Sequence, residues 1–267
     1  MRGRAADFRR IVRAYYKKHG RHDLPWRKTK DAYTILVSEV MLQQTQVERV
    51  IPFYTKFLKQ FPTAKSLAAA PLSAVLKAWQ GLGYNRRAKM LHQAAKELGT
   101  RRELSVEELE KLPGVGPYTA RAVAAFAYNQ DVIFVETNIR TVIIHHFFPK
   151  KKKVSDTEIE KILTQAFPKG KSRQWYSALM DYGASLKRGG VSHNARSTTH
   201  TKQSTFAGSL REARGAILRE LARGGAPRTR VVGLLGAARR GQVADAVTAL
   251  QAEGLVRVRG NRVTLAD

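Results

Sequence analysis

The chain has 267 residues, of which 43% are hydrophobic, so it can bury the core of one large domain or of two smaller ones. Its 48 lysines and arginines outnumber its 21 acidic residues and give a formal charge of +27, which indicates a polyanionic partner. Nucleic acid fits this charge better than an anionic membrane surface. The absence of cysteine excludes disulfides, thiolate catalysis and cysteine-ligated zinc or iron–sulfur clusters.

Neither a membrane span nor a metal site is expected. No apolar run approaches the roughly 20 residues that cross a bilayer, and the N-terminus lacks the apolar core of a secretory signal. We therefore expect a cytoplasmic protein, or one otherwise intracellular, that stays with the cell's DNA. The seven histidines follow no metal-ligand spacing, so we predict no metal site.

The first part of the chain predicts two helices separated by a break. Residues 1–20 have apolar side chains at helical spacing among arginines and predict a basic helix. The sequence LPWR at 24–27 interrupts it, because proline cannot continue a helix. Residues 33–47 are apolar on most helical faces, which predicts a buried helix.

Glu39 lies within that apolar helix. Burial disfavours the charged form of a carboxyl group, and proteins use this effect to keep a proton donor near neutral pH. The alternative is that Glu39 faces solvent or pairs with Arg49 for structure. The amides of residues 43–46, QQTQ, can donate and accept hydrogen bonds in place of a displaced base, but they also suit a solvated helix end.

Two further helices are predicted at 51–60 and 73–79, before the sequence GLGYNRRAKML at 81–91. Two glycines make a turn there, with Tyr84 at its tip, and three basic residues open the next helix: Arg86, Arg87 and Lys89. An aromatic ring beside arginines is typical of a nucleic-acid contact. A basic, solvated helix end is the alternative.

Residues 112–138, LPGVGPYTARAVAAFAYNQDVIFVETN, contain a glycine turn, a small-residue helix and a carboxylate. Gly114 and Gly116 suit a tight turn whose N–H groups can approach an anion, and Pro117 is well placed in the first turn of the next helix. A helix N-terminus of this kind can hold a phosphate. A simple turn between two packed helices is the alternative. The apolar run that follows ends at Glu136.

Six motifs occur in order and carry a resemblance: LPWR, SEVMLQQTQV, GLGY, LPGVGPYTA, VETN and ALMDYGA (178–184). Together they resemble the helix-hairpin-helix DNA glycosylase superfamily, over about residues 5–186. The SEVMLQQTQ segment is most similar to the adenine-DNA glycosylase branch. Mismatch thymine or uracil glycosylases share the general pattern, as does the endonuclease III type more distantly.

The resemblance implies a mostly helical, two-lobed fold in which the hairpin grips a DNA phosphate and a nucleotide is flipped into the cleft. It implies that Glu39 is the general acid, that Tyr118 hydrogen-bonds within the active site, and that Glu136 takes the position of a catalytic aspartate. It also implies a base pocket of Trp26, Arg27, Leu42 and Asp181. DNA contacts are implied at Gln43, Gln44, Thr45, Tyr84, Arg86, Gly114, Gly116, Thr119 and Asn138, with Gln44 and Tyr84 filling or wedging the opened stack.

The chemistry also follows from the residues themselves. Breaking an N-glycosidic bond develops positive charge on the sugar and negative charge on the base. The reaction is therefore helped by a proton donor beside the base and a carboxylate beside the sugar. Glu39 and Glu136 form that pair. A lysine at position 118 would permit a Schiff base and strand cleavage, whereas Tyr118 would not, so a monofunctional enzyme is predicted.

Three departures from the family pattern bear on this hypothesis. Glu136 replaces aspartate and moves the carboxylate by up to about 1.5 Å, which can cost roughly a hundredfold in rate. Asp131 is a weaker substitute for it. The second departure is the iron–sulfur cluster that relatives usually carry after ALMDYGA. Residues 187–208 contain no thiol and form a basic loop instead. This loop either contacts DNA phosphates or is disordered.

The third departure is the C-terminal region, 209–267, where the family's 8-oxoguanine recognition domain is missing. Helices are predicted at 210–223, 228–236 and 239–253, followed by a β-hairpin around Gly260. This pattern resembles a winged helix-turn-helix. Its arginines, at 239, 240, 257, 259 and 262, are available for phosphate or groove contact. A packing or partner-binding domain is the alternative.

The sequence therefore predicts a mostly α, two-lobed glycosylase domain at 1–208 and a small winged-helix-like domain at 209–267. The predicted function is excision of a mispaired or damaged base, with adenine as the leading substrate, from double-stranded DNA. We expect a monomer that needs no cofactor and binds no membrane. The alternatives are a glycosylase for thymine, uracil or a deaminated or alkylated base, and a non-catalytic DNA-binding protein.

Overall fold

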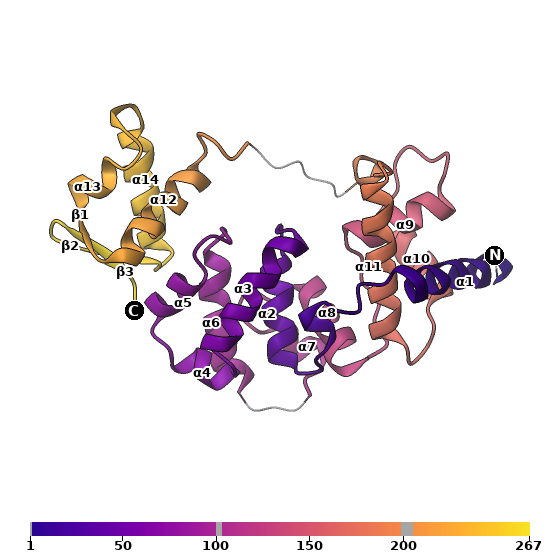
Figure 1. The fold of residues 1–267 in the computed structure, drawn as a ribbon. Helices are drawn as coiled ribbons and strands as arrows, with labels where there is room; N and C mark the ends of the chain where they lie inside the picture. Colours follow the sequence, from indigo (N-terminus) through magenta and orange to yellow (C-terminus); the bar gives the residue numbers. More distant parts are fainter. Residues whose placement is uncertain (1, 100–102, 199–204) are drawn as a thin grey trace. The chain divides into compact units, whose positions relative to one another are not determined.

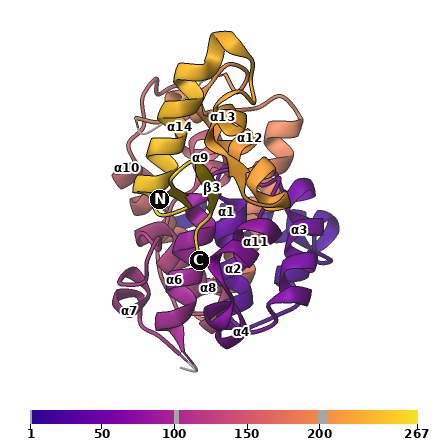
Figure 2. The same ribbon diagram turned by 90° about the vertical axis from the view of Figure 1, so that its left-hand side faces the viewer.

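The computed structural model describes residues 2–99, 103–198 and 205–267, and these are mostly helical (Figures 1 and 2). The chain forms two compact units, and each draws on several separate stretches of sequence. Unit 1 comprises Met1–Leu36, Glu103–Lys111 and Val115–Lys202. Unit 2 comprises Val37–Arg102, Leu112–Gly114 and Gln203–Asp267.

Unit 1 is a helical bundle around an apolar core that includes Phe8, Val12, Ile143 and Trp175. Figure 1 shows α9 beside the long helix α11. The helices of this unit are α1 (Arg2–His19), η1 (Pro25–Arg27), the first turn of α2 (Ala32–Leu42), α7 (Val106–Glu110), α8 (Pro117–Tyr128), α9 (Thr137–Phe147), α10 (Asp156–Ala166), α11 (Ser172–Arg188) and η2 (Asn194–Arg196).

Helices α9 and α11 approach each other closely at Gly183. A Cβ atom at this position would lie 2.3 Å from the carbonyl oxygen of Asn138, at the start of α9. Only glycine fits that distance, because real Cβ atoms do not approach a backbone atom so closely. The glycine of the ALMDYGA motif therefore sets how near α11 lies to the beginning of α9.

Unit 2 contains a second set of helices and the only described sheet. Its helices are the rest of α2, α3 (Val47–Gln60), α4 (Ala64–Ala69), α5 (Leu72–Ala78), α6 (Arg86–Leu98), α12 (Leu210–Arg223), α13 (Arg228–Val232), η3 (Ala237–Arg239) and α14 (Arg240–Ala252). Strands β1 (Ala226–Pro227), β2 (Val256–Arg259) and β3 (Arg262–Leu265) pair antiparallel in the order β1-β3-β2.

Several predicted elements are confirmed. The basic N-terminal helix is α1, and the helix expected at 210–223 is α12 with the same bounds. The predicted hairpin is β2 and β3, closed by the pair Arg259 and Arg262 around Gly260-Asn261. The mostly helical fold class is likewise confirmed, while the boundary at 208 stays a prediction.

Two boundaries predicted from the sequence are wrong. The helix expected at 33–47 ends at Leu42, because Gln44 adopts a left-handed conformation with φ of 55°. A new helix, α3, then begins at Val47 instead of residue 51. Helix α4 was not predicted; it is short, and the reciprocal hydrogen bonds of Thr63 and Ser66 define its start.

The helix predicted at 228–236 is also shorter than expected and ends at Val232. Among the described residues, no helix is both long enough and apolar enough to cross a membrane. Residues 199–204 of the basic loop lie outside the described part of the chain.

Candidate active site

Glu39 is only 6% exposed in α2. Its neighbours along the helix, Val37, Ser38, Val40 and Met41, are buried as well, so the apolar pattern of this segment does place the carboxyl group inside the protein. The alternative in which Glu39 faces solvent is wrong. Arg49, the suggested partner, donates a hydrogen bond to the carbonyl of Gly81.

Arg87 closes the end of the helix that carries Glu39. Its Nη1 atom donates to the carbonyls of Val40, Met41 and Gln43 at 2.8, 3.1 and 2.5 Å. The last carbonyls of a helix have no partner within the helix, so this guanidinium satisfies them. Burial lowers the pKa of Arg87 to about 10, and the nearby Tyr84 opposes that shift. Arg87 is therefore still a cation at neutral pH.

This inward position corrects the prediction for Arg87. The sequence grouped it with two other basic residues as a nucleic-acid contact or a solvated helix end, but the structure uses it to join two loops. The exposed Arg86 beside it keeps the predicted orientation toward solvent. Arg87 would have been hard to find from sequence, because its partners are backbone carbonyls more than 40 residues away.

Gln44 and Tyr84 lie in two loops that share Arg87. Both residues have positive φ angles, 55° and 47°, which is uncommon outside glycine and indicates loops held by their surroundings. Arg87 donates to the carbonyl before Gln44 and lies 5.4 Å from the centre of the Tyr84 ring. Gln44 and Gln46 are exposed, whereas Leu42, Gln43 and Thr45 are half-buried, so solvent reaches the amide of Gln44.

Tyr84 is also held from its other side by the C-terminal part of unit 2. Arg211 Nη1 donates to the Tyr84 hydroxyl at 2.7 Å and lies 5.6 Å from the ring centre. The same guanidinium lies 5.8 Å from the ring of Phe206. Tyr84 and Phe206 remain 37% and 57% exposed. Two rings and two guanidiniums thus form an alternating stack that solvent can reach.

The predicted glycine hairpin joins α7 to α8. Gly114 has a φ of 74°, and a Cβ atom there would lie 2.5 Å from the side chain of Met90, so both conformation and space require glycine. Gly116 precedes α8, and no heavy atom lies within 4 Å of the position that a Cβ atom would take there. The N-terminus of α8 is therefore accessible. Thr119, a predicted DNA contact, is buried, so its side chain does not lie on the surface.

Glu136 caps α9 in unit 1. Its Oε1 accepts hydrogen bonds from the backbone N–H groups of Asn138 and Ile139, at 2.7 and 2.8 Å. Its Oε2 accepts from Thr137 Oγ1 and Asn138 Nδ2, both at 3.2 Å. These bonds satisfy N–H groups at the start of α9 that have no partner within the helix. The predicted DNA contact Asn138 therefore orients Glu136.

Lys187 near the end of α11 was missed by sequence reasoning. It is half-buried, and burial lowers its pKa, while attraction to Glu136 opposes the shift and repulsion from Arg140 adds to it. Lys187 is thus the amine associated electrostatically with Glu136. Its only sequence signal was its place three residues after the ALMDYGA segment. Asp131, the weaker substitute for Glu136, instead accepts hydrogen bonds from the N–H of Gly170 and from the Ser172 hydroxyl, at the segment that leads into α11.

Two predicted base-pocket residues form a buried ion pair in unit 1. Arg27 donates to both carboxylate oxygens of Asp181, at 2.5 and 2.9 Å, and Arg21 donates from its Nε and its backbone N–H. Burial would raise the pKa of Asp181, which is 2% exposed, but the hydrogen bonds and charges of Arg27 and Arg21 outweigh it and lower that pKa. Asp181 thus binds η1 to α11, and the adjacent Trp26 is half-buried.

Tyr118 is half-buried near the start of α8, with its ring edge-on to Phe134 at 5.6 Å. The segment after α11 is partly ordered. Arg196 donates to carbonyls of Phe148 and Lys151, and Val154 pairs with Ser197 in a parallel bridge. These donors are turned onto the backbone, and the segment has no thiolate, so its residues do not fit an iron–sulfur cluster.

Comparison with known proteins identifies relatives along most of the chain. A family model described as HhH-GPD superfamily base excision DNA repair protein matches residues 37–169. An adenine DNA glycosylase from Mycolicibacterium smegmatis is 38% identical over 89% of both chains. The adenine DNA glycosylase from Buchnera aphidicola subsp. Baizongia pistaciae is 36% identical over 66% of this chain, which spans 52% of that relative.

Solved structures give the same fold. A thermostable thymine-DNA glycosylase has a TM-score of 0.62 and 28% identity, covering 68% of this chain and 87% of that one. A trapped endonuclease III–DNA covalent intermediate has a TM-score of 0.55 at 19% identity, covering 70% of this chain and 85% of that one.

Proposed function

The chain belongs to the HhH-GPD superfamily of base excision DNA repair proteins, in the branch of the adenine DNA glycosylases, and from this premise we propose that it is a monofunctional glycosylase that removes mispaired adenine from duplex DNA. The observation that carries the proposal is the burial of Glu39 inside an apolar helix. Buried carboxyl groups supply protons near neutral pH, as excision of a purine requires. The flipped nucleotide gives the enzyme access to the glycosidic bond.

The proposed reaction divides the work between two carboxyl groups. Glu39 gives its proton to the adenine ring, the bond from C1′ to N9 breaks, and its electron pair leaves with the base. The sugar then carries positive charge, which the anionic Glu136 stabilises until water adds to C1′ and loses a proton. The four hydrogen bonds to Glu136 support this assignment, because they fix the carboxylate before the charge develops.

DNA contacts are proposed for the loops that solvent reaches. Gln44 and Tyr84 fill or wedge the opened stack, because both are exposed at loop tips and held in place by Arg87. The N–H groups at Gly116 and the start of α8 take a phosphate. The enzyme acts as a monomer, and its basic charge supports binding to duplex DNA.

The experiment is a panel of duplexes, each carrying one mispaired or damaged base, incubated with the protein and then heated with alkali to cut abasic sites. Adenine release that depends on Glu39 and Glu136 is expected. Binding without release from any duplex contradicts the enzymatic proposal. Strand scission before alkali contradicts the monofunctional assignment and points to Lys187, the amine whose pKa burial lowers.

Thymine is the second candidate substrate, favoured by the structural likeness to the thermostable thymine-DNA glycosylase. Duplexes with thymine opposite guanine therefore belong in the same panel. Faster release of thymine than of adenine would reverse the order of the two substrates.

A further inference from the structure

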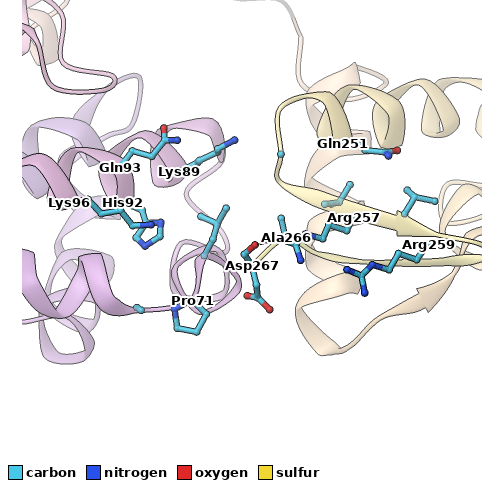
Figure 3. Close-up of a pocket in the computed structure, with 15 residues that line it drawn as sticks. Pro71, Lys89, His92, Gln93, Lys96, Gln251, Arg257, Arg259, Ala266 and Asp267 are labelled. Atoms are coloured by element: carbon cyan, nitrogen blue, oxygen red, sulfur yellow. Dashed lines mark hydrogen bonds between the residues drawn. The ribbon is translucent and has the colours of Figure 1, made fainter.

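A groove within unit 2 is not used by the proposed reaction. Its volume is about 610 Å³. One side is formed by residues 70–72 and by α6, and the other by the end of α14, strand β2 and the last two residues, Ala266 and Asp267 (Figure 3). The groove therefore lies between the helices that follow the Glu39 segment and the β-hairpin of the C-terminal region.

Two rows of cationic side chains line this groove. Lys89 and Lys96 lie on α6, which also presents Gln93 between them at a spacing of four and three residues, as expected for one helical face. Arg257 and Arg259 lie two residues apart on β2 and so project to the same side of the strand. Figure 3 shows Lys89 and Lys96 from one side and the two arginines from the other.

Acidic groups do not balance these charges. Among the lining residues only Asp267 is acidic, and its carboxylate accepts from the N–H of Ser73 at 3.2 Å. The carboxylate of nearby Glu253 pairs with Arg214 at 2.6 Å, while its carbonyl accepts from Lys89 Nζ at 2.5 Å. Like charges around one groove repel each other, and a bound anion removes this cost.

The arrangement of the cations fits an extended anion. Lys89 and Lys96 are seven residues apart, about 10 Å along a helix, and the two arginines are about 7 Å apart along a strand. A compact phosphate would need converging donors. Among the lining residues the single aromatic ring is His92, which is only 5% exposed. No ring there can stack on a base, which favours a sugar-phosphate backbone.

We propose that this groove binds the DNA backbone of the duplex flanking the lesion, an inference that rests on the proposed function. Helix α6 begins two residues after Tyr84, the proposed wedge, and Arg86 to Lys96 spans about 15 Å. At about 3.4 Å per base pair, this distance corresponds to roughly four base pairs. The groove therefore contacts phosphates about four base pairs from the flipped nucleotide, on one side of it.

Binding to duplexes with a tetrahydrofuran abasic analogue tests this, because the analogue fixes the register without catalysis. Each flank is shortened in turn from ten to three base pairs, and affinity is measured by fluorescence anisotropy. The full chain should lose about tenfold when one particular flank is trimmed. The double variant Lys96→Ala, Arg259→Ala should bind the long duplex about tenfold more weakly and should not respond to trimming.

Salt dependence gives an independent readout. Each phosphate contact contributes about 0.9 to the slope of log affinity against log salt. The slope of the double variant should be smaller in magnitude by about 1.8. Between 50 and 200 mM salt, the factor by which its affinity falls should therefore be about twelve times smaller than the factor for the wild type. The control Lys161→Ala, Lys169→Ala removes the same charge from exposed positions in unit 1.

An unchanged slope in the Lys96/Arg259 variant, or equal sensitivity of both proteins to trimming, overturns the proposal. Binding of pyrophosphate or hexa-aspartate that depends on these two residues, with duplex binding unaffected, assigns the groove to another anion and also overturns it. Base release is measured separately on a mispaired duplex with long flanks. Failure of that reaction rejects the proposed function, while the flank and salt measurements still report on the groove.

Discussion

The two proposed catalytic carboxyl groups lie in opposite kinds of surroundings. Glu39 is buried in the middle of an apolar helix, whereas Glu136 is half-buried at the beginning of a helix and accepts four hydrogen bonds. In general, burial among apolar side chains disfavours the charged form of a carboxyl group, whereas hydrogen bonds from a helix N-terminus stabilise that form. The same side chain can therefore serve as proton donor in one place and as charge stabiliser in the other, without any difference in its own chemistry.

The largest expected effect tests the acid. Glu39→Gln keeps the size and polarity of the side chain but removes its proton, so single-turnover adenine release should fall by about 10³-fold, within the range for general acid catalysis. Binding to the abasic-analogue duplex should remain within about twofold. Glu97→Gln, an exposed glutamate on α6, is the control. If the Glu39→Gln variant still releases adenine at the wild-type rate, Glu39 is not the general acid.

The next effect tests the anion and separates capping from chemistry. Glu136→Ser retains a side-chain acceptor for the N-terminus of α9 but has no charge, so base release should fall about 10²–10³-fold while stability stays nearly constant. Glu136→Ala should lose the same activity and about 1 kcal/mol of stability. Urea denaturation and single-turnover rates measure the two quantities. Near-normal release in the serine variant would show that the charge is not needed.

Asp181 is a third buried carboxyl group, and it forms ion pairs with Arg21 and Arg27. Asp181→Asn should lower the unfolding free energy at pH 7 by about 3 kcal/mol, since it leaves two half-buried arginines without their buried counter-charge. The pKa of Asp181 in the folded protein lies below its ordinary value of 3.8. Its contribution is therefore complete above that value and is lost as the pH falls through the lower folded pKa. Urea denaturation should show a constant difference between the two proteins from pH 7 to about pH 4, and the two should converge only below pH 3.8.

Arg87 tests whether the Glu39 helix depends on its terminal cation. Arg87→Ala leaves several helix-end carbonyls without their donor, so we expect a loss of about 2 kcal/mol in unfolding free energy. Arg86→Ala, in the exposed neighbour, should change stability by less than about 0.5 kcal/mol. Equal effects of the two variants would mean that the bonds to Val40, Met41 and Gln43 contribute little.

The smallest expected effect concerns Arg211 and Tyr84. Arg211→Ala and Tyr84→Phe each remove the hydrogen bond between these two side chains. Each variant should therefore raise the free energy of duplex distortion by about 1 kcal/mol. The effect of the double variant should be smaller than the sum of the two single effects. The fluorescence of 2-aminopurine beside the lesion reports unstacking. Full additivity would show that Arg211 does not position the Tyr84 ring.

Sequence periodicity was sufficient for long elements with strong patterns. Helices α1 and α12 and the hairpin of β2 and β3 were predicted because their spacing or turn residues are local signals. The end of α2 was not, because a guanidinium from α6 fixes it. Arg239 was expected on a DNA surface, but it pairs with Glu212 at 2.7 Å inside unit 2, and such pairings depend on side chains that are distant in the chain.

The sequence by itself determined the family, the polyanionic partner and the place of the glycine hairpin, since motif spacing and charge are properties of the chain, whereas it left open whether Glu39 is buried. The tertiary structure decided which groups hold the site. It placed Arg87 on the carbonyls of the Glu39 helix, the N–H groups of α9 on Glu136, two arginines on Asp181 and Arg211 on Tyr84. Each is a contact between groups whose directions are set only when separate elements pack together, and no local pattern encodes it.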